Sequence, residues 1–260
     1  MPTVGLLISS FRHPADISSS GWWTVLAHPF ETAQWTVANY AAVLGSQGMA
    51  NAFLNSLIVT IPATLIPISL AAFAAYAFAW MRFRGRTMLF VVVVGLLVVP
   101  LQMTLVPLLR LFLQFDLAGT FVGTWLAHTG FGLPLAIYLL YNYMADLPRE
   151  LFESAFVDGA SHHTAFLRLA LPLSFPALAA FAIFQFLWVW NDLLVALVFL
   201  GTRSEVGVVT AQLNELVGTR GDSWHLLTAG AFLTMAVPVA VFLLLQRYFV
   251  RGLLAGAVKG

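Results

Sequence analysis

Residues 153–172 read ESAFVDGASHHTAFLRLALP, and they interrupt a chain that is otherwise almost entirely apolar. Within this stretch stand two acids, a glycine, two histidines, an arginine and a closing proline. A patterned polar stretch in an apolar chain indicates a segment that lies in water while its neighbours are buried. The composition of the rest of the chain shows whether those neighbours are buried in protein or in lipid.

The composition places the chain in a membrane. Of its 260 residues, 60% are hydrophobic and 9% are charged, and the mean hydropathy is +0.90. A soluble domain carries about 25% charged residues, so this chain lacks the side chains to cover a soluble surface. We therefore predict an all-α polytopic membrane protein. It has no cysteine, which excludes disulfides and thiolate metal sites.

Five apolar stretches are long enough to span a bilayer, and we expect each to be one complete helix. They cover residues 52–80, 87–110, 119–144, 173–200 and 226–250. A sixth stretch, MPTVGLLIS at the start, has too few residues before Arg12 to cross. We expect it to be the outer end of a first span that is incomplete, through a late-placed start codon or a truncated helix. Prolines within the spans predict kinks, which serve packing or act as hinges of a gate; they are Pro62, Pro67, Pro100, Pro107, Pro134 and Pro238.

The positions of lysine and arginine predict the orientation, because these residues accumulate on the cytoplasmic side of membrane proteins. One side takes segments 81–86, 145–172 and 251–260 together with Arg247, and it holds eight of the twelve basic residues. We therefore expect the opening stretch and the C-terminus to be cytoplasmic. Residues 1–50 are then the end of the first span and an extracytoplasmic segment, 51–250 the transmembrane domain, and 251–260 a cytoplasmic tail.

The polar stretch itself is predicted to be two short helices separated by a glycine. Asp146 or Leu147 is expected to cap the first helix, with Pro148 in its first turn, where a missing N–H does no harm. Its apolar side chains recur at helical spacing and predict one stripe; they are Leu151, Phe152, Ala155, Phe156, Gly159 and Ala160.

A turn at Asp158 and Gly159 ends the first helix, and Ser161 is predicted to cap a second helix that runs to Pro172. Small residues at this corner allow another protein's backbone to come close. An alternative is a helix that lies on lipid headgroups, which would require many basic residues on its polar face. The segment holds more acids than arginines, so docking to a protein is favoured.

The spacing of this stretch resembles the EAA loop of ABC-importer permeases, whose pattern is E-A-A-x3-G-x9-I-x-L-P. Glu153, Ala155 and Gly159 stand at the same intervals, and the sequence closes with Leu171 and Pro172. Two positions depart conservatively, since Ser154 and Leu169 replace alanine and isoleucine. The tail RYFVRGLLAGAVKG resembles the sugar-importer branch, the maltose-type second permease, and the start of the chain is similar to α-glucoside permeases.

This resemblance implies the six-helix type I importer permease fold, with a cytoplasmic coupling helix between spans 4 and 5. The helix would dock in a cleft of a separate ATPase subunit through the EAA-loop residues Glu153, Ser154, Ala155, Asp158, Gly159, Ala160, Leu169, Leu171 and Pro172. The tail would also reach the ATPase dimer through Gly256, Ala257, Val258, Lys259 and Gly260.

The partners that the resemblance implies are a second permease subunit, two ATP-binding cassette ATPase subunits and an extracytoplasmic sugar-binding protein. The chain would be a multi-pass subunit in the bacterial cytoplasmic (inner) membrane that moves an α-glucoside or a related oligosaccharide. ATP and Mg²⁺ would be bound by the partner subunits, so no cofactor and no enzymatic activity are expected of this chain.

Missing motifs agree with that expectation. The single lysine, Lys259, is followed only by Gly260, so the chain has no P-loop. It also has no H-E-x-x-H metal helix, no G-x-S-x-G turn and no basic stripe for nucleic acid. His162 and His163 are adjacent and point in different directions on a helix, so we interpret them as surface residues rather than metal ligands.

Trp190, Asn191 and Asp192 form a polar group within the predicted span 173–200. Ionisable residues inside a membrane usually face a cavity or a partner. Three interpretations remain open: a lining of the sugar path, a hydrogen bond between helices, or proton coupling through Asp192. The last corresponds to an alternative function, a proton-coupled secondary transporter. An intramembrane enzyme is a third hypothesis, but the sequence offers no nucleophile–base pair or metal-ligand set for it.

Overall fold

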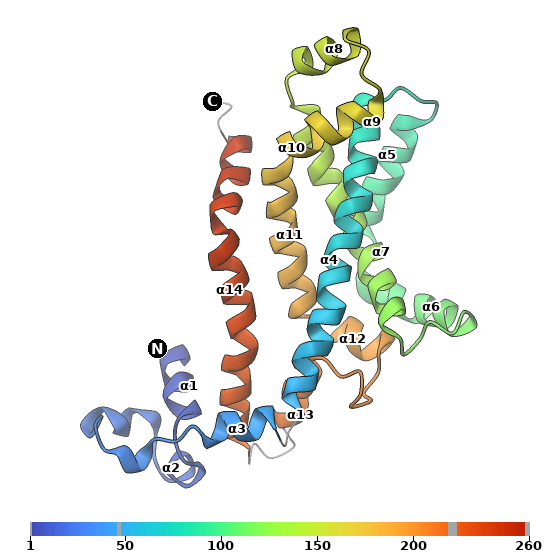
Figure 1. The fold of residues 1–260 in the computed structure, drawn as a ribbon. Coiled ribbons are helices and arrows are strands. Elements are labelled where there is room, and N and C mark those ends of the chain that lie inside the picture. Colours follow the sequence, from blue (N-terminus) through green and yellow to red (C-terminus); the bar gives the residue numbers. More distant parts are fainter. Residues whose placement is uncertain (1, 46–47, 218–222, 258–260) are drawn as a thin grey trace. The chain divides into compact units, whose positions relative to one another are not determined.

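The computed structural model is built from helices (Figure 1) and describes residues 2–45, 48–217 and 223–257. Within these ranges no strand occurs, and the one extended pairing is an isolated bridge between Arg12 and Trp35. The predicted all-α class is confirmed. The chain forms two compact units, Met1–Ile58 with Trp190–Ala240 and Val59–Val189 with Val241–Gly260.

The first unit contains the N-terminal segment and the ends of two long helices. The side-chain amide of Asn39 donates to the carbonyls of Ser10 and Arg12 at 3.0 and 2.9 Å, and the buried Arg12 guanidinium donates to the Ser20 hydroxyl at 2.7 Å. These bonds hold the segment in a defined fold. Its elements are α1 (Pro2–Ser10), α2 (Pro14–Ser19), η1 (Trp22–Ala27), η2 (Thr32–Gln34), α3 (Ala38–Leu44), the start of α4 (Met49–Trp80), α12 (Leu194–Phe199), α13 (Val209–Val217) and the first half of α14 (Trp224–Ala257).

The second unit contains most of α4 and the helices that follow it. Small side chains allow α4 and α7 to approach each other, since Ala71, Ala75 and Ala136 are fully buried in one core cluster. The elements are α5 (Arg86–Gly95), η3 (Leu96–Val98), α6 (Leu101–Gln114), α7 (Phe121–Ala145), α8 (Arg149–Val157), α9 (His162–Ala165), the π-helical η4 (Phe166–Ala170), α10 (Leu171–Leu173) and α11 (Phe175–Trp190).

Two of the described helices are long and apolar enough to cross a membrane, Met49–Trp80 and Trp224–Gln246. The number rises to four if each of two bent pairs counts as one span. These pairs are Arg86–Val98 with Leu101–Gln114, bent by 105°, and His162–Leu173 with Phe175–Trp190, bent by 68°. The predicted stretch 119–144 is one helix of 25 residues, α7, but it is not among these candidate spans.

The expectation of one continuous helix was wrong for two of the five stretches. In 87–110 the helix breaks at Val99, whose ψ of 118° is the extended conformation that a following proline imposes, and α6 begins after Pro100. In 173–200 the helix ends at Trp190 and resumes at Leu194. Apolar composition therefore located these segments but did not show where they are interrupted.

Two prolines inside long helices are accommodated by side chains of α11. A proline lacks an N–H, so the carbonyl four residues before it has no partner within the helix. For Pro67 in α4 this is the carbonyl of Ala63, which accepts a 3.1 Å hydrogen bond from Gln185 Nε2. For Pro238 in α14 it is the carbonyl of Thr234, which accepts a 3.2 Å bond from Trp190 Nε1.

Candidate functional site

The first half of the polar stretch is α8, which starts at Arg149. Pro148 occupies the capping position in an extended conformation (ψ 120°), and no side chain caps the helix. The predicted caps Asp146 and Leu147 were therefore wrong by one or two residues, because Pro148 itself sets the entry to the helix. Glu150 lies in the first turn, where a carboxylate is favourable to the helix dipole.

Gly159 forms the corner between the two halves of the segment. Its φ is +84°, a left-handed conformation that glycine adopts without strain. The Ala160 N–H donates to the Ala155 carbonyl at 2.9 Å, and the Gly159 N–H donates to the Phe156 carbonyl at 3.1 Å. This pair of bonds is a Schellman motif, which ends α8 after Val157. A Cβ placed on Gly159 would meet no atom within 4 Å, so the corner opens onto free space.

The second half begins with the predicted cap. Ser161 Oγ accepts a hydrogen bond from the Thr164 backbone N–H at 3.2 Å, which confirms Ser161 as the N-cap of α9. The helix then continues through η4 and α10 to Leu173, and it bends by 68° into α11. The predicted end of this helix at Pro172 is therefore correct to within one residue.

Aromatic contacts fasten the segment to α4. The fully buried ring of Phe152 stacks on Trp80, with centroids 3.8 Å apart and planes at 19°. Phe166, also buried, lies 5.3 Å from the ring of Tyr76. The Tyr76 hydroxyl lies 3.1 Å from Nδ1 of His162, at hydrogen-bonding distance. Both histidines are exposed, as the sequence predicted, but it gave no signal that His162 contacts α4.

The outward face of the segment combines small, acidic and apolar groups. Among the predicted docking residues, Glu153, Ser154, Asp158 and Gly159 are exposed, and Ala155 and Ala160 are partly exposed. Of the predicted apolar stripe, Phe152 is buried but Leu151 is exposed, and the nearby Val157 is 87% exposed. Leu169 and Leu171 pack against the core of the second unit, and Pro172 is exposed. The segment thus has one face that packs against the second unit, which we call the seated face, and one face that is exposed.

The group predicted within the fourth complete span lies in the first unit, at the end of α11 and the break after it. Trp190 is buried, with its ring 6.0 Å from that of Phe53 and its indole N–H on the Thr234 carbonyl. Asn191 is exposed. A carboxylate oxygen of Asp192 accepts a hydrogen bond from the Ala196 N–H at 3.0 Å, in the first turn of α12. Its own carbonyl accepts a 2.7 Å bond from Thr210 Oγ1.

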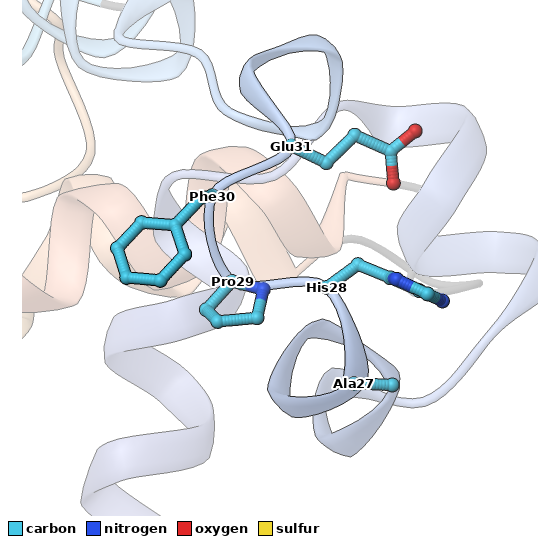
Figure 2. A pocket seen from close by; sticks show the side chains of 5 residues that line it. All are labelled: Ala27, His28, Pro29, Phe30 and Glu31. Carbon is cyan, nitrogen blue, oxygen red and sulfur yellow. The ribbon is translucent and has the colours of Figure 1, made fainter.

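A shallow hollow lies in the N-terminal segment, lined by Ala27, His28, Pro29, Phe30 and Glu31 (Figure 2). Figure 2 shows the phenyl ring of Phe30 on one side of the loop and the side chains of His28 and Glu31 on the other. The Trp35 indole N–H donates to the Pro29 carbonyl at 3.1 Å and steadies the loop. Phe30 is 93% exposed. The sequence did not single out this loop.

Comparison with known proteins gives the family. Residues 67–254 match the family described as binding-protein-dependent transport system inner membrane component, and that range includes the whole polar segment. The chain belongs to this family. It is therefore a permease subunit of an ABC importer, a class of transport subunits that are not enzymes themselves, and the resemblance drawn from the EAA loop is confirmed.

Two relatives are similar to this permease at the same level of identity. The osmoprotective compounds uptake permease protein GgtD of Synechocystis sp. is 62% identical over 100% of this chain and 87% of its own length. The alpha-glucoside transport system permease protein AglG of Rhizobium meliloti is also 62% identical, over 87% of this chain and 61% of its own length.

The fold of the permease also matches solved structures. A chain from a bacterial ABC transporter that imports the acidic polysaccharide alginate aligns with a TM-score of 0.78, at 17% identity, over 95% of this chain and 90% of its own. A second alginate transporter structure contains a periplasmic protein bound to an alginate pentasaccharide, and its chain aligns with a TM-score of 0.65 at 15% identity, covering 85% of this chain and 84% of its own. The predicted importer permease fold is therefore confirmed.

The C-terminal tail of the permease is only partly described. Gly256 and Ala257 are the last helical residues of α14, and their surroundings are not defined. Val258, Lys259 and Gly260 lie outside the described residues. Contact between this tail and an ATPase therefore stays a prediction.

Proposed function

We propose that this permease moves an α-glucoside or a related oligosaccharide across the bacterial cytoplasmic membrane, driven by a separate ATPase that docks on residues 145–172, which we call the coupling segment. The observation that carries the proposal is the construction of this segment. Its seated face is held on α4 by Phe152 and Phe166, while its corner at Gly159 faces free space. A rigid element with an open corner can transmit the movement of a docked partner to the helices behind it.

The assembly that this function requires contains four further subunits. They are a second permease, two ATPase subunits and an extracytoplasmic sugar-binding protein, and the ATPase subunits bind ATP and Mg²⁺. Family membership supports the binding protein, because the family is named for binding-protein-dependent transport. The excess of arginine in and around the coupling segment and the C-terminal tail supports a cytoplasmic position for both.

The choice of substrate class rests on the relatives. AglG is named as an alpha-glucoside permease and GgtD as a permease for osmoprotective compounds. A neutral hydroxylated glycoside fits the chain better than an acidic sugar, because the five apolar stretches contain only two basic residues, Arg110 and Arg247, each at or near an end of its stretch. An anionic cargo would need such groups along its path.

Reconstitution tests the proposal. The complex of two permeases and two ATPase subunits in proteoliposomes, supplied with the binding protein, should show ATPase activity that rises with a panel of α-glucosides and accumulate the same compounds. Acidic oligosaccharides of similar size serve as the negative panel. Uptake by this chain alone, without an ATPase, would show the proposal to be wrong, and stimulation by the acidic panel alone would overturn the substrate class.

A further inference from the structure

A hollow of about 490 Å³ lies in the second unit, between the coupling segment and the ends of the helices that carry it. Its walls come from the end of α4, the α4–α5 turn, the end of α7 and the inner side of α8. Three arginines line it, Arg82, Arg86 and Arg149, and we call it the arginine hollow. In Figure 1, α8 and the α4–α5 turn lie at the same end of this unit.

The charge of the arginine hollow is unbalanced. Glu153 is the one carboxylate among its lining residues, against three guanidinium groups. Arg86 donates to the Met81 carbonyl at 3.1 Å, so its position is fixed. Among residues 2–45, 48–217 and 223–257, no side-chain hydrogen bond or ion pair is found for the guanidinium groups of Arg82 and Arg149. Guanidinium groups that line one hollow and keep their donors available are suited to a phosphate, which they bind with good geometry.

The surroundings of the arginine hollow match the depth of lipid headgroups. Trp80 and Tyr141 line it, and Trp80 is the last residue of a helix that is apolar enough to cross a membrane. Tryptophan and tyrosine are enriched where membrane helices meet water. Immediately beyond Arg86, α5 exposes an apolar face along which acyl chains can lie; its members are Met88, Leu89, Val91 and Val92.

We propose that the arginine hollow binds the phosphate headgroup of an anionic phospholipid, with Arg82 and Arg149 as the principal ligands and the acyl chains along α5. Basic pockets between membrane helices on the cytoplasmic side bind anionic headgroups in this way. Because the lipid would touch both α5 and α8, it would brace the coupling segment. This site goes beyond the transport function, since lipid binding requires neither the cargo nor ATP.

An acidic side chain of the ATPase is the competing occupant. The lipid is favoured because the arginine hollow is walled by α4, α5 and α7 and adjoins the exposed apolar face of α5. The ATPase is expected instead at the Gly159 corner, which opens away from the core. Lipid binding in the arginine hollow and ATPase binding at the Gly159 corner can therefore be measured separately.

Native mass spectrometry of the assembled importer tests the assignment. The complex would be titrated with phosphatidylglycerol, and phosphatidylcholine would serve as the zwitterionic reference. Arg82→Gln and Arg149→Gln should each weaken retention of phosphatidylglycerol about fivefold, the effect expected of one arginine near an anionic headgroup. Arg84→Gln is the matched control, because Arg84 is exposed in the same turn but does not line the arginine hollow. Equal loss in all three variants would overturn the proposal.

Two further measurements distinguish a bound lipid from a soluble phosphate ester and from an acidic side chain of the ATPase. Soluble glycerol phosphate at millimolar concentration should leave the bound lipid in place; displacement would assign the hollow to a free phosphate ester and overturn the lipid assignment. Lipid retention should fall in Arg82→Gln while the ATPase subunits stay bound. Loss of the ATPase with unchanged lipid retention would assign the hollow to the ATPase instead.

Discussion

The side-chain amide of Gln185 donates a 3.1 Å hydrogen bond to the backbone carbonyl of Ala63. This carbonyl has lost its helical partner, because the residue four positions on is Pro67. Gln185 is 1% exposed, and an unpaired polar group in such a place is unfavourable. Pro67 leaves the Ala63 carbonyl without a helical donor, and the buried amide of Gln185 supplies one. The same hydrogen bond therefore satisfies two buried polar groups, the carbonyl and the glutamine side chain.

The first prediction is that Gln185→Leu lowers the stability of the permease, and that adding Pro67→Ala restores most of it. The single change leaves the Ala63 carbonyl unpaired in the core, at a loss of about 1–3 kcal/mol. The second change returns an N–H to position 67, which can then donate to Ala63. Melting temperatures of the two single variants and the double variant in detergent form the cycle.

Gln246→Leu provides the control for that cycle, because Gln246 is exposed and its side-chain amide donates to the Leu243 carbonyl within its own helix. Its melting temperature should stay close to that of the wild type. If Pro67→Ala gives no rescue, the link between the proline and the glutamine is wrong.

A second prediction concerns Trp190, whose indole N–H pairs with the carbonyl left by Pro238. Trp190→Phe keeps an aromatic ring but removes the donor, so the melting temperature should fall while the KM for the transported glycoside stays unchanged. Pro238→Ala should then recover stability. A raised KM with an unchanged melting temperature would instead support the role of Trp190 in the sugar path that the sequence suggested.

The hydrogen bonds at the two prolines are contacts that the sequence did not predict. Apolar length placed helices at 52–80, 119–144 and 226–250, because burial in lipid depends on composition along the chain. The residues around Gly159 predicted two short helices with a corner between them, because turn and cap preferences depend on neighbouring residues. Contacts between distant residues, such as Trp80 with Phe152 or Gln185 with Ala63, depend on how helices pack, and no periodicity in one sequence records that. The break in the helix between Trp190 and Leu194 was not predicted, because the sequence on both sides of it is equally apolar.

A third prediction separates the two adjacent histidines. His162 lies 3.1 Å from the Tyr76 hydroxyl and its ring is 5.0 Å from that of Phe156, so it ties α9 to α4 and α8. His162→Ala should therefore reduce the transport achieved per ATP hydrolysed, whereas His163→Ala, at the adjacent and equally exposed position, should not. Tyr76→Phe should reproduce a smaller part of the loss, because it removes only the hydroxyl. Equal effects of the two histidine variants would contradict this role.

A fourth prediction addresses Asp192. Its carboxylate accepts from the Ala196 N–H at the start of α12, a role that an asparagine oxygen can also fill. Asp192→Asn should therefore retain ATP-driven uptake, and Asp192→Ala should lower the melting temperature, because the Ala196 N–H in the first turn of α12 loses its acceptor, at a cost of about 1 kcal/mol. Dissipating the proton gradient in proteoliposomes should leave uptake unchanged. Loss of uptake in Asp192→Asn, together with collapse on dissipation, would favour proton coupling.

The fifth prediction uses the corner at Gly159, where backbone strain and partner contact can be told apart. At φ +84° a side chain other than asparagine adds about 1–2 kcal/mol of strain, but the space around the Cβ position is empty. Gly159→Asn should therefore fold and remain coupled, since asparagine tolerates this conformation and is small. Gly159→Trp should insert and fold but lose transport, because its ring occupies the space that the ATPase needs.

Gly201 is the matched control for Gly159, with φ +83° and nothing within 4 Å of its Cβ position, but it lies outside the coupling segment. Gly201→Trp carries the same strain, so it should match Gly159→Trp in melting temperature and yet keep ATP-dependent uptake. If only Gly159→Trp loses transport, backbone strain cannot explain the loss, and blocked docking of the ATPase can. Normal ATP-dependent uptake by Gly159→Trp would rule out the corner as the contact point with the ATPase, whatever its effect on stability.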